Sequence, residues 1–452
     1  MKVDTSIFRA YDIRGIYPKE INAEVAYAIG QAYVKVVNPD GAIVIGHDVR
    51  LHSEELKKAM IEGILDAGID VIDIGLISTE MIYFATGYYG YAGGIQSTAS
   101  HQPSEWHGAK MVKRNAEPIF RDNGMNEIKE FVVSGKKINK KRGELTQKDV
   151  LDDFCKYILT WIEPKNIKEM KVVANANFGF QGKLLDRIIE MGKLPIEIIK
   201  LNYEPDGTFP KGSPNPYLPE NREEFVELVK KEEPDFGVAW DADADRVFFA
   251  TKKGLFLEPY YTNTLLIQDI LKKFPGSKIV YDPRNTRALI DTIKSNGGKP
   301  VIANVGHSFI KAKMRGENAV FCGESSGHTY YRDFWFADSG MIPFLQMLEV
   351  LSSEKKTLDE MIEEVMKKYY ISGEENFTTD KAKEITEECE ETFDDGEADK
   401  FEGLTIEYPD WRFNLRSSNT EPLLRINLEA NSKELMERKL EEVKLIIENP
   451  KK

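Results

Sequence analysis

Three aspartates alternate with alanine in the segment WDADADRVFF, residues 240–249. In an extended segment the two-residue period places Asp241, Asp243 and Asp245 on one side. Three carboxylates so close together repel one another and need a cation, and hard oxygen ligands favour Mg²⁺ or Ca²⁺. The flanking runs DFGVAW and RVFFA are β-like, which places the loop at a sheet edge. Because Mg²⁺ prefers a substrate phosphate as a further ligand, the pattern indicates phosphoryl transfer.

Two other interpretations compete for this segment. An EF-hand calcium loop requires Gly at its sixth position and Glu at its twelfth, but these positions hold Arg246 and Lys252, so we exclude it. A solvated acidic turn is the second interpretation, and the segment alone leaves it open.

A possible nucleophile lies in QSTASHQPSEWHGAK, residues 96–110. Ser100 stands between small residues and precedes His101, a setting typical of a nucleophile exposed at a strand end. The loop follows the apolar run YAGGI and is interrupted by Pro103. An ordinary Ser/Thr-rich turn explains this loop equally well when it is taken alone.

The segment CGESSGHTYY, residues 322–331, follows the strand-like AVF. Glu324, Ser326 and His328 alternate in it and offer one acceptor and two donor/acceptor groups, which suits a vicinal pair of sugar hydroxyls. A structural turn is an equal alternative.

A fourth polar loop, RSSNTEPLLR, spans residues 416–425. Arg416 offers a guanidinium fork, and Ser418, Asn419 and Thr420 add hydroxyl, amide and backbone N–H donors. This set suits a phosphate dianion, with a polar β-turn as the alternative.

One further histidine follows an apolar run and a glycine. It is His307, in VGHSFIK. It fits a catalytic loop residue, but a helix cap or a core residue explains it as well.

The elements that must position these loops recur along the chain. A short apolar strand, a polar loop and an amphipathic helix follow one another from Ala42, from Lys171 and from Lys278. Each helix ends at or near Gly, and the β-rich VIDIG, IEIIK and PVIAN follow. The period of about 110–130 residues is the size of a domain. The sequence therefore predicts three related α/β domains with mixed, helix-covered sheets.

The end of the chain has a different pattern. EGLTIEYPD, WRFNLR and PLLRINLEA predict strands, and KELMERKLEEVKLIIE predicts a closing helix, so we expect a smaller α+β domain. The acidic run from Glu387 to Lys400 is expected to be a solvated helix and loop. Connectors such as GKKINKKRGEL divide the chain into predicted domains at 1–145, 146–251, 252–368 and 369–452.

The bulk composition narrows the partners. The chain has 452 residues, three cysteines and a net charge of −14, which argues against nucleic-acid or anionic-membrane surfaces. The distant cysteines suit a reducing cytosol. We find no signal peptide and no apolar run of about 20 residues that could span a bilayer, so the cytoplasm is the expected location.

Taken together, the loops resemble the α-D-phosphohexomutase family, the phosphomannomutases and phosphoglucomutases. The resemblance covers nearly the whole chain. It rests on the ordered segments FRAYDIRG (8–15), TASHQP (98–103), DADADR (241–246), GESSGH (323–328) and RSSNTEP (416–422). It implies three similar α/β domains and a smaller fourth around one cleft. The expected enzyme is an isomerase that moves phosphate between two positions of a sugar.

The resemblance also implies a role for each loop. The phosphate on Ser100 joins the aspartates around the expected cofactor, Mg²⁺, in a metal site of Ser100, Asp241, Asp243 and Asp245. The residues expected to be catalytic are Arg14, Ser100, His101, Lys110, Arg246 and His307, with Lys110 and His307 as candidates for proton transfer. The residues expected to bind substrate are Tyr11, Arg284, Glu324, Ser326, His328, Arg416, Ser418, Asn419, Thr420 and Arg425.

The chain departs from the family's usual pattern at three places. Gln102 stands where Asn is usual, DADADR replaces the commoner DGDGDR, and Arg284 stands where many relatives carry Lys. Alanine reduces the freedom of the backbone, but all the carboxylates remain. None of these changes removes a required group, so we expect activity.

The implied reaction passes phosphate from phosphoserine to the free hydroxyl of a hexose phosphate. A hexose bisphosphate forms, turns over within the cleft and returns its other phosphate to Ser100. Closure of the fourth domain would retain this intermediate and exclude water. We expect sugar phosphates as partners, the bisphosphate as activator, no nucleic acid, no membrane, and a monomer or weak homo-oligomer.

The lead hypothesis is a phosphomannomutase or phosphoglucomutase. A phosphoglucosamine or phosphopentose mutase is the near alternative. A non-catalytic sugar-phosphate-binding protein would not need Ser100, and a metal-dependent phosphatase would not need a phosphate-binding fourth domain.

Overall fold

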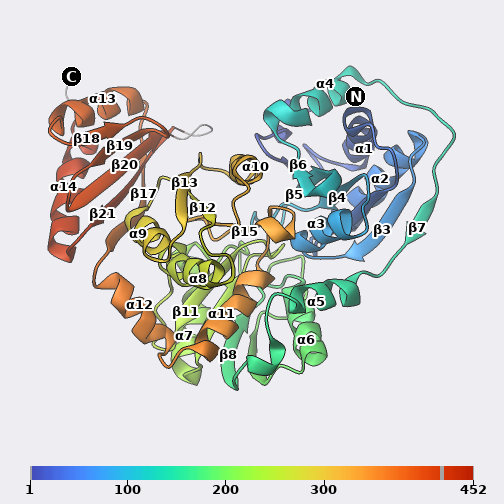
Figure 1. Ribbon diagram of the computed structural model, residues 1–452. Helices are drawn as coiled ribbons and strands as arrows, with labels where there is room; N and C mark the ends of the chain where they lie inside the picture. The colour runs from blue at the N-terminus through green and yellow to red at the C-terminus, as the bar shows by residue number, and fades with distance from the viewer. Residues whose placement is uncertain (1–2, 418–421, 451–452) are drawn as a thin grey trace.

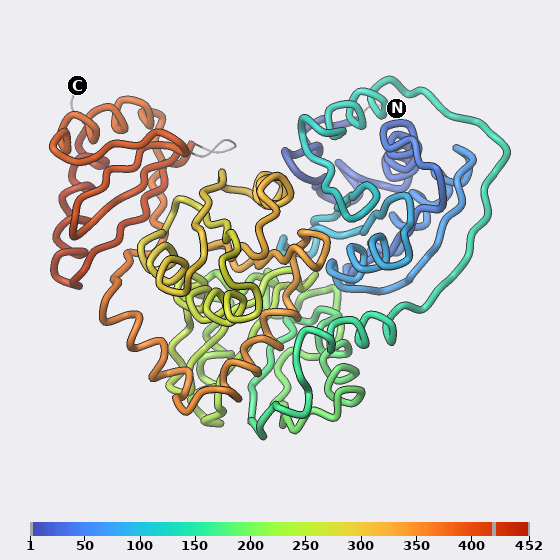
Figure 2. Tube along the Cα trace, in the orientation of Figure 1, coloured from blue at the N-terminus to red at the C-terminus, as the bar shows by residue number. Residues whose placement is uncertain are grey.

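The computed structural model describes residues 3–417 and 422–450 as four consecutive units, each built on one sheet. Figure 1 shows the N-terminal unit in blue, two central units in green and yellow, and the C-terminal unit in orange and red. The tube in Figure 2 follows the same path. Three α/β units and a smaller α+β unit confirm the fold class predicted from the sequence.

The first unit has a mixed sheet in the order β1-β5-β4-β2-β3-β7, with β6 paired to β5. Its strands are β1 (Ile13–Ile16), β2 (Ile43–His47), β3 (Val71–Leu76), β4 (Gly93–Ser97), β5 (Trp106–Lys113), β6 (Glu117–Pro118) and β7 (Leu145–Gln147). Its helices are α1 (Ala23–Val37), α2 (Ser53–Asp66), α3 (Thr79–Tyr88) and α4 (Asn126–Ser134). Helices α1 and α2 cross closely, because a Cβ on Gly30 would lie 2.3 Å from the Met60 carbonyl oxygen. At this crossing only glycine fits.

The second unit has the sheet order β11-β10-β8-β9. Its strands are β8 (Met170–Asn175), β9 (Ile196–Leu201), β10 (Phe236–Trp240) and β11 (Val247–Thr251), and its helices are α5 (Leu151–Leu159), α6 (Gln181–Gly192) and α7 (Glu223–Glu232). Strands β10 and β11 form an antiparallel hairpin in which Trp240 pairs with Val247. The aspartate loop is the connection of this hairpin, and the predicted flanking strands are confirmed.

The third unit has the sheet order β13-β12-β14-β15-β16. Its strands are β12 (Lys278–Tyr281), β13 (Lys299–Ile302), β14 (Phe321–Gly323), β15 (Thr329–Tyr331) and β16 (Ala337–Asp338). Its helices are α8 (Pro259–Lys273), α9 (Arg287–Ser295), α10 (His307–Glu317) and α11 (Met341–Ser353), and α12 (Leu358–Met366) leads to the last unit. The sugar-loop candidates of the sequence analysis lie between β14 and β15, and His307 opens α10.

The C-terminal unit is an antiparallel sheet in the order β17-β21-β20-β19-β18. Its strands are β17 (Tyr370–Thr378), β18 (Glu397–Asp399), β19 (Leu404–Glu407), β20 (Trp411–Ser417) and β21 (Leu423–Ala430), and its helices are α13 (Ala382–Thr392) and α14 (Lys433–Glu448). The three predicted strands and the closing helix are confirmed. Sequence patterns missed β17 and β18.

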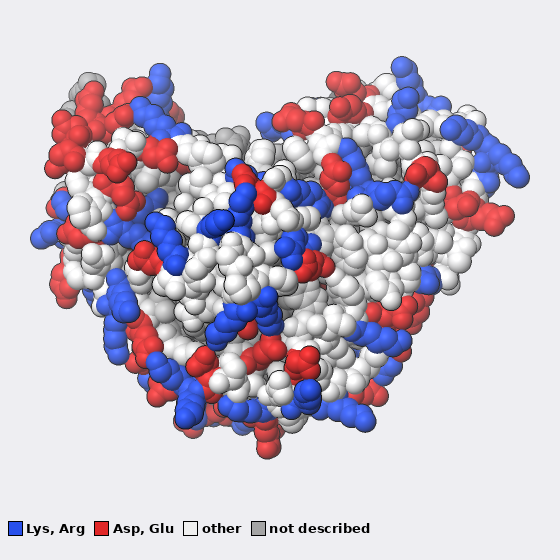
Figure 3. All heavy atoms as spheres, in the orientation of Figure 1, with Lys and Arg blue, Asp and Glu red and all other residues white. Residues whose placement is uncertain are grey.

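The packing separates the C-terminal unit from the rest. One continuous apolar core joins β8, β10, α8 and α11 of the two central units with α3 of the first. The C-terminal unit has a core of its own, built around Phe413, Ile426 and Val443. Figure 3 shows the surface hollowed between the N-terminal and C-terminal units. None of the helices in the ranges 3–417 and 422–450 combines the length and the apolar composition that a membrane span requires.

Candidate active site

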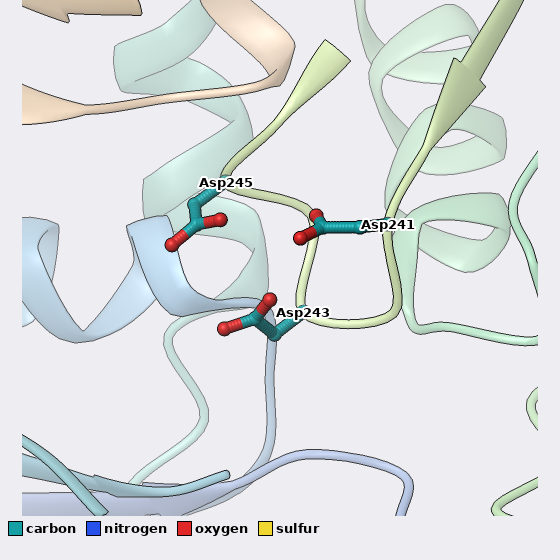
Figure 4. A group of neighbouring side chains, drawn as sticks. All are labelled: Asp241, Asp243 and Asp245. Carbon is teal, nitrogen blue, oxygen red and sulfur yellow. The ribbon is translucent and has the colours of Figure 1, made fainter. Parts of the chain in front are cut away.

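The three aspartates converge inside the molecule. The side chains of Asp241, Asp243 and Asp245 are buried, and one carboxylate oxygen of each lies within 4.8 Å of the others. Figure 4 shows the three carboxylates turned toward one another from a single loop. The turn places Ala244 at φ +62°, in the left-handed region where a Cβ costs roughly 1–2 kcal/mol. This is the position where the commoner DGDGDR sequence has glycine.

Neighbouring donors hold the carboxylates in place. Thr79 donates through Oγ1 to Asp243 Oδ2 at 2.6 Å and through its backbone N–H to the Asp243 carbonyl oxygen at 2.8 Å. Lys110 Nζ donates to Asp243 Oδ2 at 2.6 Å and also to Asp245 Oδ2. The backbone N–H of Arg246 donates to Asp241 Oδ1 at 3.2 Å.

The positive charges of Lys110, Arg246 and His328 lie against this cluster and act on the pKa values of its carboxyls. Burial, Asp243 and Asp245 raise the pKa of Asp241 to about 8. Burial opposes ionisation of Asp245 as well, but Lys110 and His328 hold its pKa well below the usual value. Among the described residues no donor reaches Asp243 Oδ1, which is buried. Hard oxygen donors that converge and an unbonded carboxylate oxygen fit a divalent cation.

Ser100 lies against this cluster, as the sequence hypothesis requires. Its Oγ is 3.3 Å from Asp241 Oδ2 and 3.1 Å from His101 Nδ1, and the residue is buried. The backbone of Ser100 has φ +53°, a conformation that residues other than glycine rarely adopt. Its N–H donates to Thr98 Oγ1 at 2.9 Å, which helps to fix the turn.

A buried arginine that the sequence analysis did not identify supports the serine loop. The Arg50 guanidinium donates to the carbonyl oxygens of Ser100 and Gln102 at 2.6 and 2.5 Å. It also donates to those of Pro103 and Trp106 at 2.7 and 2.9 Å. Asp48 accepts from Thr98 Oγ1 at 2.7 Å and lies 3.3 Å from Arg50 Nε. A planar fork of this kind can satisfy several carbonyls that an ammonium cannot.

Further cations and rings surround the serine. Arg14 Nε donates to Asp12 at 2.7 Å, and Arg246 Nε lies 3.8 Å from Asp241 Oδ2. The ring of Tyr11 packs edge-on against His307, with 5.0 Å between centroids. Burial, followed by nearby cations, lowers the pKa of His101 and of His307 well below the usual value. Both rings are therefore neutral at pH 7.

The sugar-loop candidates form one hydrogen-bonded group. Glu324 accepts from Arg284 at 3.0 Å and from the Tyr330 hydroxyl at 2.8 Å, and it lies 3.2 Å from His328 Nδ1. Ser326 Oγ is 2.9 Å from His328 Nδ1. Burial opposes the ionised form of Glu324, but His328 and Arg284 hold the pKa of this carboxyl well below the usual value. Burial also opposes the charged form of His328, but Asp245 and Glu324 raise its pKa to about 9.

The phosphate-loop candidates lie apart, on the C-terminal unit. Arg416 is at the end of β20, paired in register with Arg425 of β21, and it is only 7% exposed. Its Nη2 donates to Glu374 at 2.7 Å. Three predicted residues of this loop lie outside the described ranges: Ser418, Asn419 and Thr420.

A second residue that was not predicted, Glu80, connects the three units that form the site. Glu80 of α3 is fully buried and accepts hydrogen bonds from Gln181 Nε2 at 3.1 Å, from the Met341 backbone N–H at 3.2 Å and from Ser339 Oγ. These partners belong to the second and third units. Because the contacts exist only in the folded chain, no sequence pattern marks them.

Comparison with known proteins gives consistent matches along the chain. Family models described as Phosphoglucomutase/phosphomannomutase match in four parts: alpha/beta/alpha domain I at residues 5–139, domain II at 152–254, domain III at 258–369 and the C-terminal domain at 352–446. A phosphomannomutase of Escherichia coli is 41% identical over 446 residues, covering 96% of this chain and 98% of the relative. Phosphohexose mutases of Xanthomonas campestris are 43% identical over 429 residues, covering 94% of each chain. A crystal structure of a phosphoglucomutase/phosphomannomutase family protein from Burkholderia thailandensis superposes with a TM-score of 0.89 at 31% identity, covering 99% of both chains.

Proposed function

The chain belongs to the phosphoglucomutase/phosphomannomutase family and is a phosphohexomutase, an isomerase, and we propose that Ser100 is its phosphate carrier. In this proposal Ser100 passes a phosphate to a hexose monophosphate and takes back the other phosphate of the bisphosphate that forms. Hexose 6-phosphate and hexose 1-phosphate are thereby interconverted.

One observation carries the assignment of Ser100. Its Oγ lies 3.3 Å from Asp241 Oδ2, although 141 positions separate the two residues. A serine held in a left-handed turn against a buried carboxylate cluster is a costly arrangement for a purely structural loop. It suits a hydroxyl that must meet a charge-neutralising site.

We assign magnesium to the carboxylate cluster, held by Asp241, Asp243, Asp245 and an oxygen of the phosphate on Ser100. When bound, the ion would neutralise charge on the transferring phosphate. The unbonded Asp243 Oδ1 and the convergence of three carboxylates support this assignment. In the proposal Lys110 keeps its proton, because Asp243 and Asp245 outweigh burial and raise its pKa, so it acts as a positive partner or proton donor.

Neutral histidines are the proposed proton acceptors. His101 Nδ1 is within 3.1 Å of Ser100 Oγ, and His307 lies at the start of α10 beside Tyr11. A base must be neutral and close to the hydroxyl whose proton it takes. Arg14 and Arg246 supply positive charge around the same serine, as their effects on the His101 pKa indicate.

The sugar is proposed to bind between the third unit and the place where the Ser100 loop meets the three aspartates, which we call the serine corner. Ionised Glu324 would accept hydrogen bonds from two sugar hydroxyls. Arg284 and His328 contact Glu324 and orient it, and Ser326 contacts His328. Arg416 binds the phosphate that is not being transferred, with Arg425 and the residues 418–420 as further partners. We propose mannose and glucose phosphates as substrates, since the relatives are named as phosphomannomutases and phosphohexose mutases.

The remaining expectations belong to the same proposal. A hexose bisphosphate would serve as activator and intermediate, and the C-terminal unit would close over it. The three cysteines, all in the described part of the chain, are buried and free, which supports the cytoplasm as the location.

The test is a measurement of phosphate on the protein. The chain is incubated with a hexose 1,6-bisphosphate, and mass spectrometry of the intact protein and its peptides follows. We expect one stable phosphate, located on Ser100, that is still present after turnover of hexose monophosphate, because each cycle returns a phosphate to the serine. In the matched control Ser104→Ala, from the same loop, phosphorylation should persist. Ser100→Ala should lose it together with mutase turnover in a coupled assay, and a Ser100→Ala variant with full turnover would refute the proposal.

A further inference from the structure

Glu374 forms an ion pair with the arginine proposed to bind the distal phosphate. Arg416 Nη2 and Glu374 Oε2 are 2.7 Å apart, and the two side chains are only 8% and 18% exposed. Arg425 Nε approaches the other carboxylate oxygen to 4.0 Å. A guanidinium this deeply buried needs a nearby anion, and Glu374 supplies it.

The backbone directs Glu374 to this position. Strand β17 carries a bulge between Ile371 and Glu374, and Gly373 within it has φ +77°. Bulges change the direction in which the following side chains point. The next residue, Glu375, pairs instead with Lys444 of α14 at 2.6 Å. Two successive glutamates therefore serve opposite faces of the strand, and only one of them contacts the arginines.

Glu374 also offsets repulsion between two units. Burial and the neighbouring Arg284 lower the pKa of Arg416, and Glu374 acts in the opposite direction. Glu374 contributes to the raised pKa of Arg284 as well, even though burial opposes it. A negative group at this point is therefore in range of cations from the third and the C-terminal unit. A phosphate dianion in the same place would take over both interactions.

From these contacts we propose that Glu374 is a positioning residue that takes the place of the distal phosphate on Arg416. The inference rests on the proposed function, because it needs Arg416 as the phosphate-binding residue. A phosphate monoester must displace the carboxylate, so Glu374 lowers the affinity for that phosphate. The same competition helps the bisphosphate to leave Arg416 when it turns over.

The test measures binding of inorganic phosphate by calorimetry in Glu374→Gln and in the matched control Glu375→Gln. We expect Glu374→Gln to bind phosphate about tenfold more tightly than the native chain, and Glu375→Gln to bind within about twofold. A double-mutant cycle with Arg416→Ala identifies the site, because phosphate can also bind near Ser100. The gain from Glu374→Gln should vanish in the Arg416→Ala background. Unchanged or weaker binding in Glu374→Gln, or a gain that persists without Arg416, would overturn the proposal.

Steady-state kinetics give a second readout that a structural role would not produce. Glu374→Gln should lower KM for the hexose phosphate several-fold and also lower kcat, because a tighter grip slows the turn of the bisphosphate. A raised KM would contradict the proposal. Failure of the proposed function would look different: the native chain would lack turnover and phosphoserine, whereas the phosphate-binding cycle would still report on Glu374.

Discussion

The corner around Ser100 and the arginine pair of the C-terminal unit differ in how they are held. In the corner, contacts between units are short and buried: Lys110 and Thr79 of the first unit bind Asp243 of the second, and Trp240 Nε1 donates to the Gly340 carbonyl of the third at 2.9 Å. Arg416, in contrast, sits on a unit with a separate core and pairs with a carboxylate of that same unit. In the proposed function, the chemistry is built on the joined units, and the distal phosphate is recognised by the separate one.

The attachment of the C-terminal unit is polar. Glu429 of β21 accepts from the Tyr260 hydroxyl at 2.6 Å and from the Thr286 backbone N–H at 2.7 Å. Arg412 of β20 donates to the carbonyl oxygens of Pro283 and Arg284 at 3.0 Å. Arg287 of α9, in the third unit, donates to Glu407 and to the carbonyl oxygen of Trp411, both in the C-terminal unit. A polar joint of this kind allows one body to pivot on another with less loss of apolar contact than a shared core would. Substitutions in the two regions should therefore change different kinetic parameters.

The largest effect is expected in the corner, for Asp243→Asn. Removing one charge from the cluster should lower kcat about 10²–10³-fold and raise the magnesium concentration needed for half-maximal rate. A magnesium titration of the coupled assay measures both. The exposed Asp186→Asn is the control and should behave as the native chain. An unchanged magnesium titration in Asp243→Asn would remove the residue from the metal site.

Arg50→Lys tests whether the shape of the serine loop, and not only its charge, supports the chemistry. One ammonium cannot satisfy the four carbonyls that the guanidinium binds, so Ser100 should lose its fixed position. We expect kcat to fall about 10–100-fold while KM changes less than about threefold. Phosphoserine content and thermal midpoint are measured alongside.

The control for Arg50 is Arg114→Lys, an exposed arginine that also donates to a carbonyl, that of Gly90 at 2.7 Å. It should leave both constants unchanged. If Arg50→Lys raised KM and spared kcat, the distinction between the two regions would fail at this point.

Much of the corner could be predicted from the sequence. The strand, loop and helix repeats predicted the sheets, and short-range patterns predicted the strands on both sides of the aspartates. The meeting of Ser100 with Asp241 followed from the family resemblance. Glu80 and Arg50 could not be predicted, because their partners are backbone carbonyls and side chains brought together only by the fold. The positive φ of Ala244 was equally hidden, although the replacement of glycine was visible.

The C-terminal unit was harder to predict where charge interrupts alternation. Strand β17 reads YISGEENFT, in which Gly373 and two glutamates hide the period of two. Its bulge is the physical reason, because an extra residue shifts the register between Ile371 and Glu374. The pairing of Glu374 with Arg416 was therefore not visible, while Arg416 itself was.

Arg416→Ala should give the opposite kinetic pattern to the corner variants. Loss of charge-assisted hydrogen bonds to the distal phosphate should raise KM about 10–100-fold and change kcat less. Measurements with hexose 1-phosphate and with hexose 6-phosphate should agree, because Arg416 is proposed to bind the phosphate that is not transferred in both directions of the reaction. A fall in kcat at constant KM would indicate that Arg416 acts in the chemical step. It would contradict the distinction between the region around Ser100 and the C-terminal unit.

The smallest effect on turnover is expected for Glu80, the carboxyl that joins the three units around Ser100, where we predict a change in stability. Burial raises the pKa of Glu80 to about 7 from an ordinary 4.5. Between these values the folded chain binds more protons than the unfolded chain, so stability falls as pH rises through this window, by about 3 kcal/mol in all. Glu80→Gln mimics the protonated form and should reduce this decline between about pH 5 and 7 in thermal or urea unfolding, while the share due to Asp241, whose pKa is also raised, remains. Glu54→Gln, at an exposed position on α2, should retain it. If the Glu80→Gln variant kept the full native decline, another group would set the pH dependence of stability. The contribution of Glu80 to stability would then be smaller than its contacts indicate.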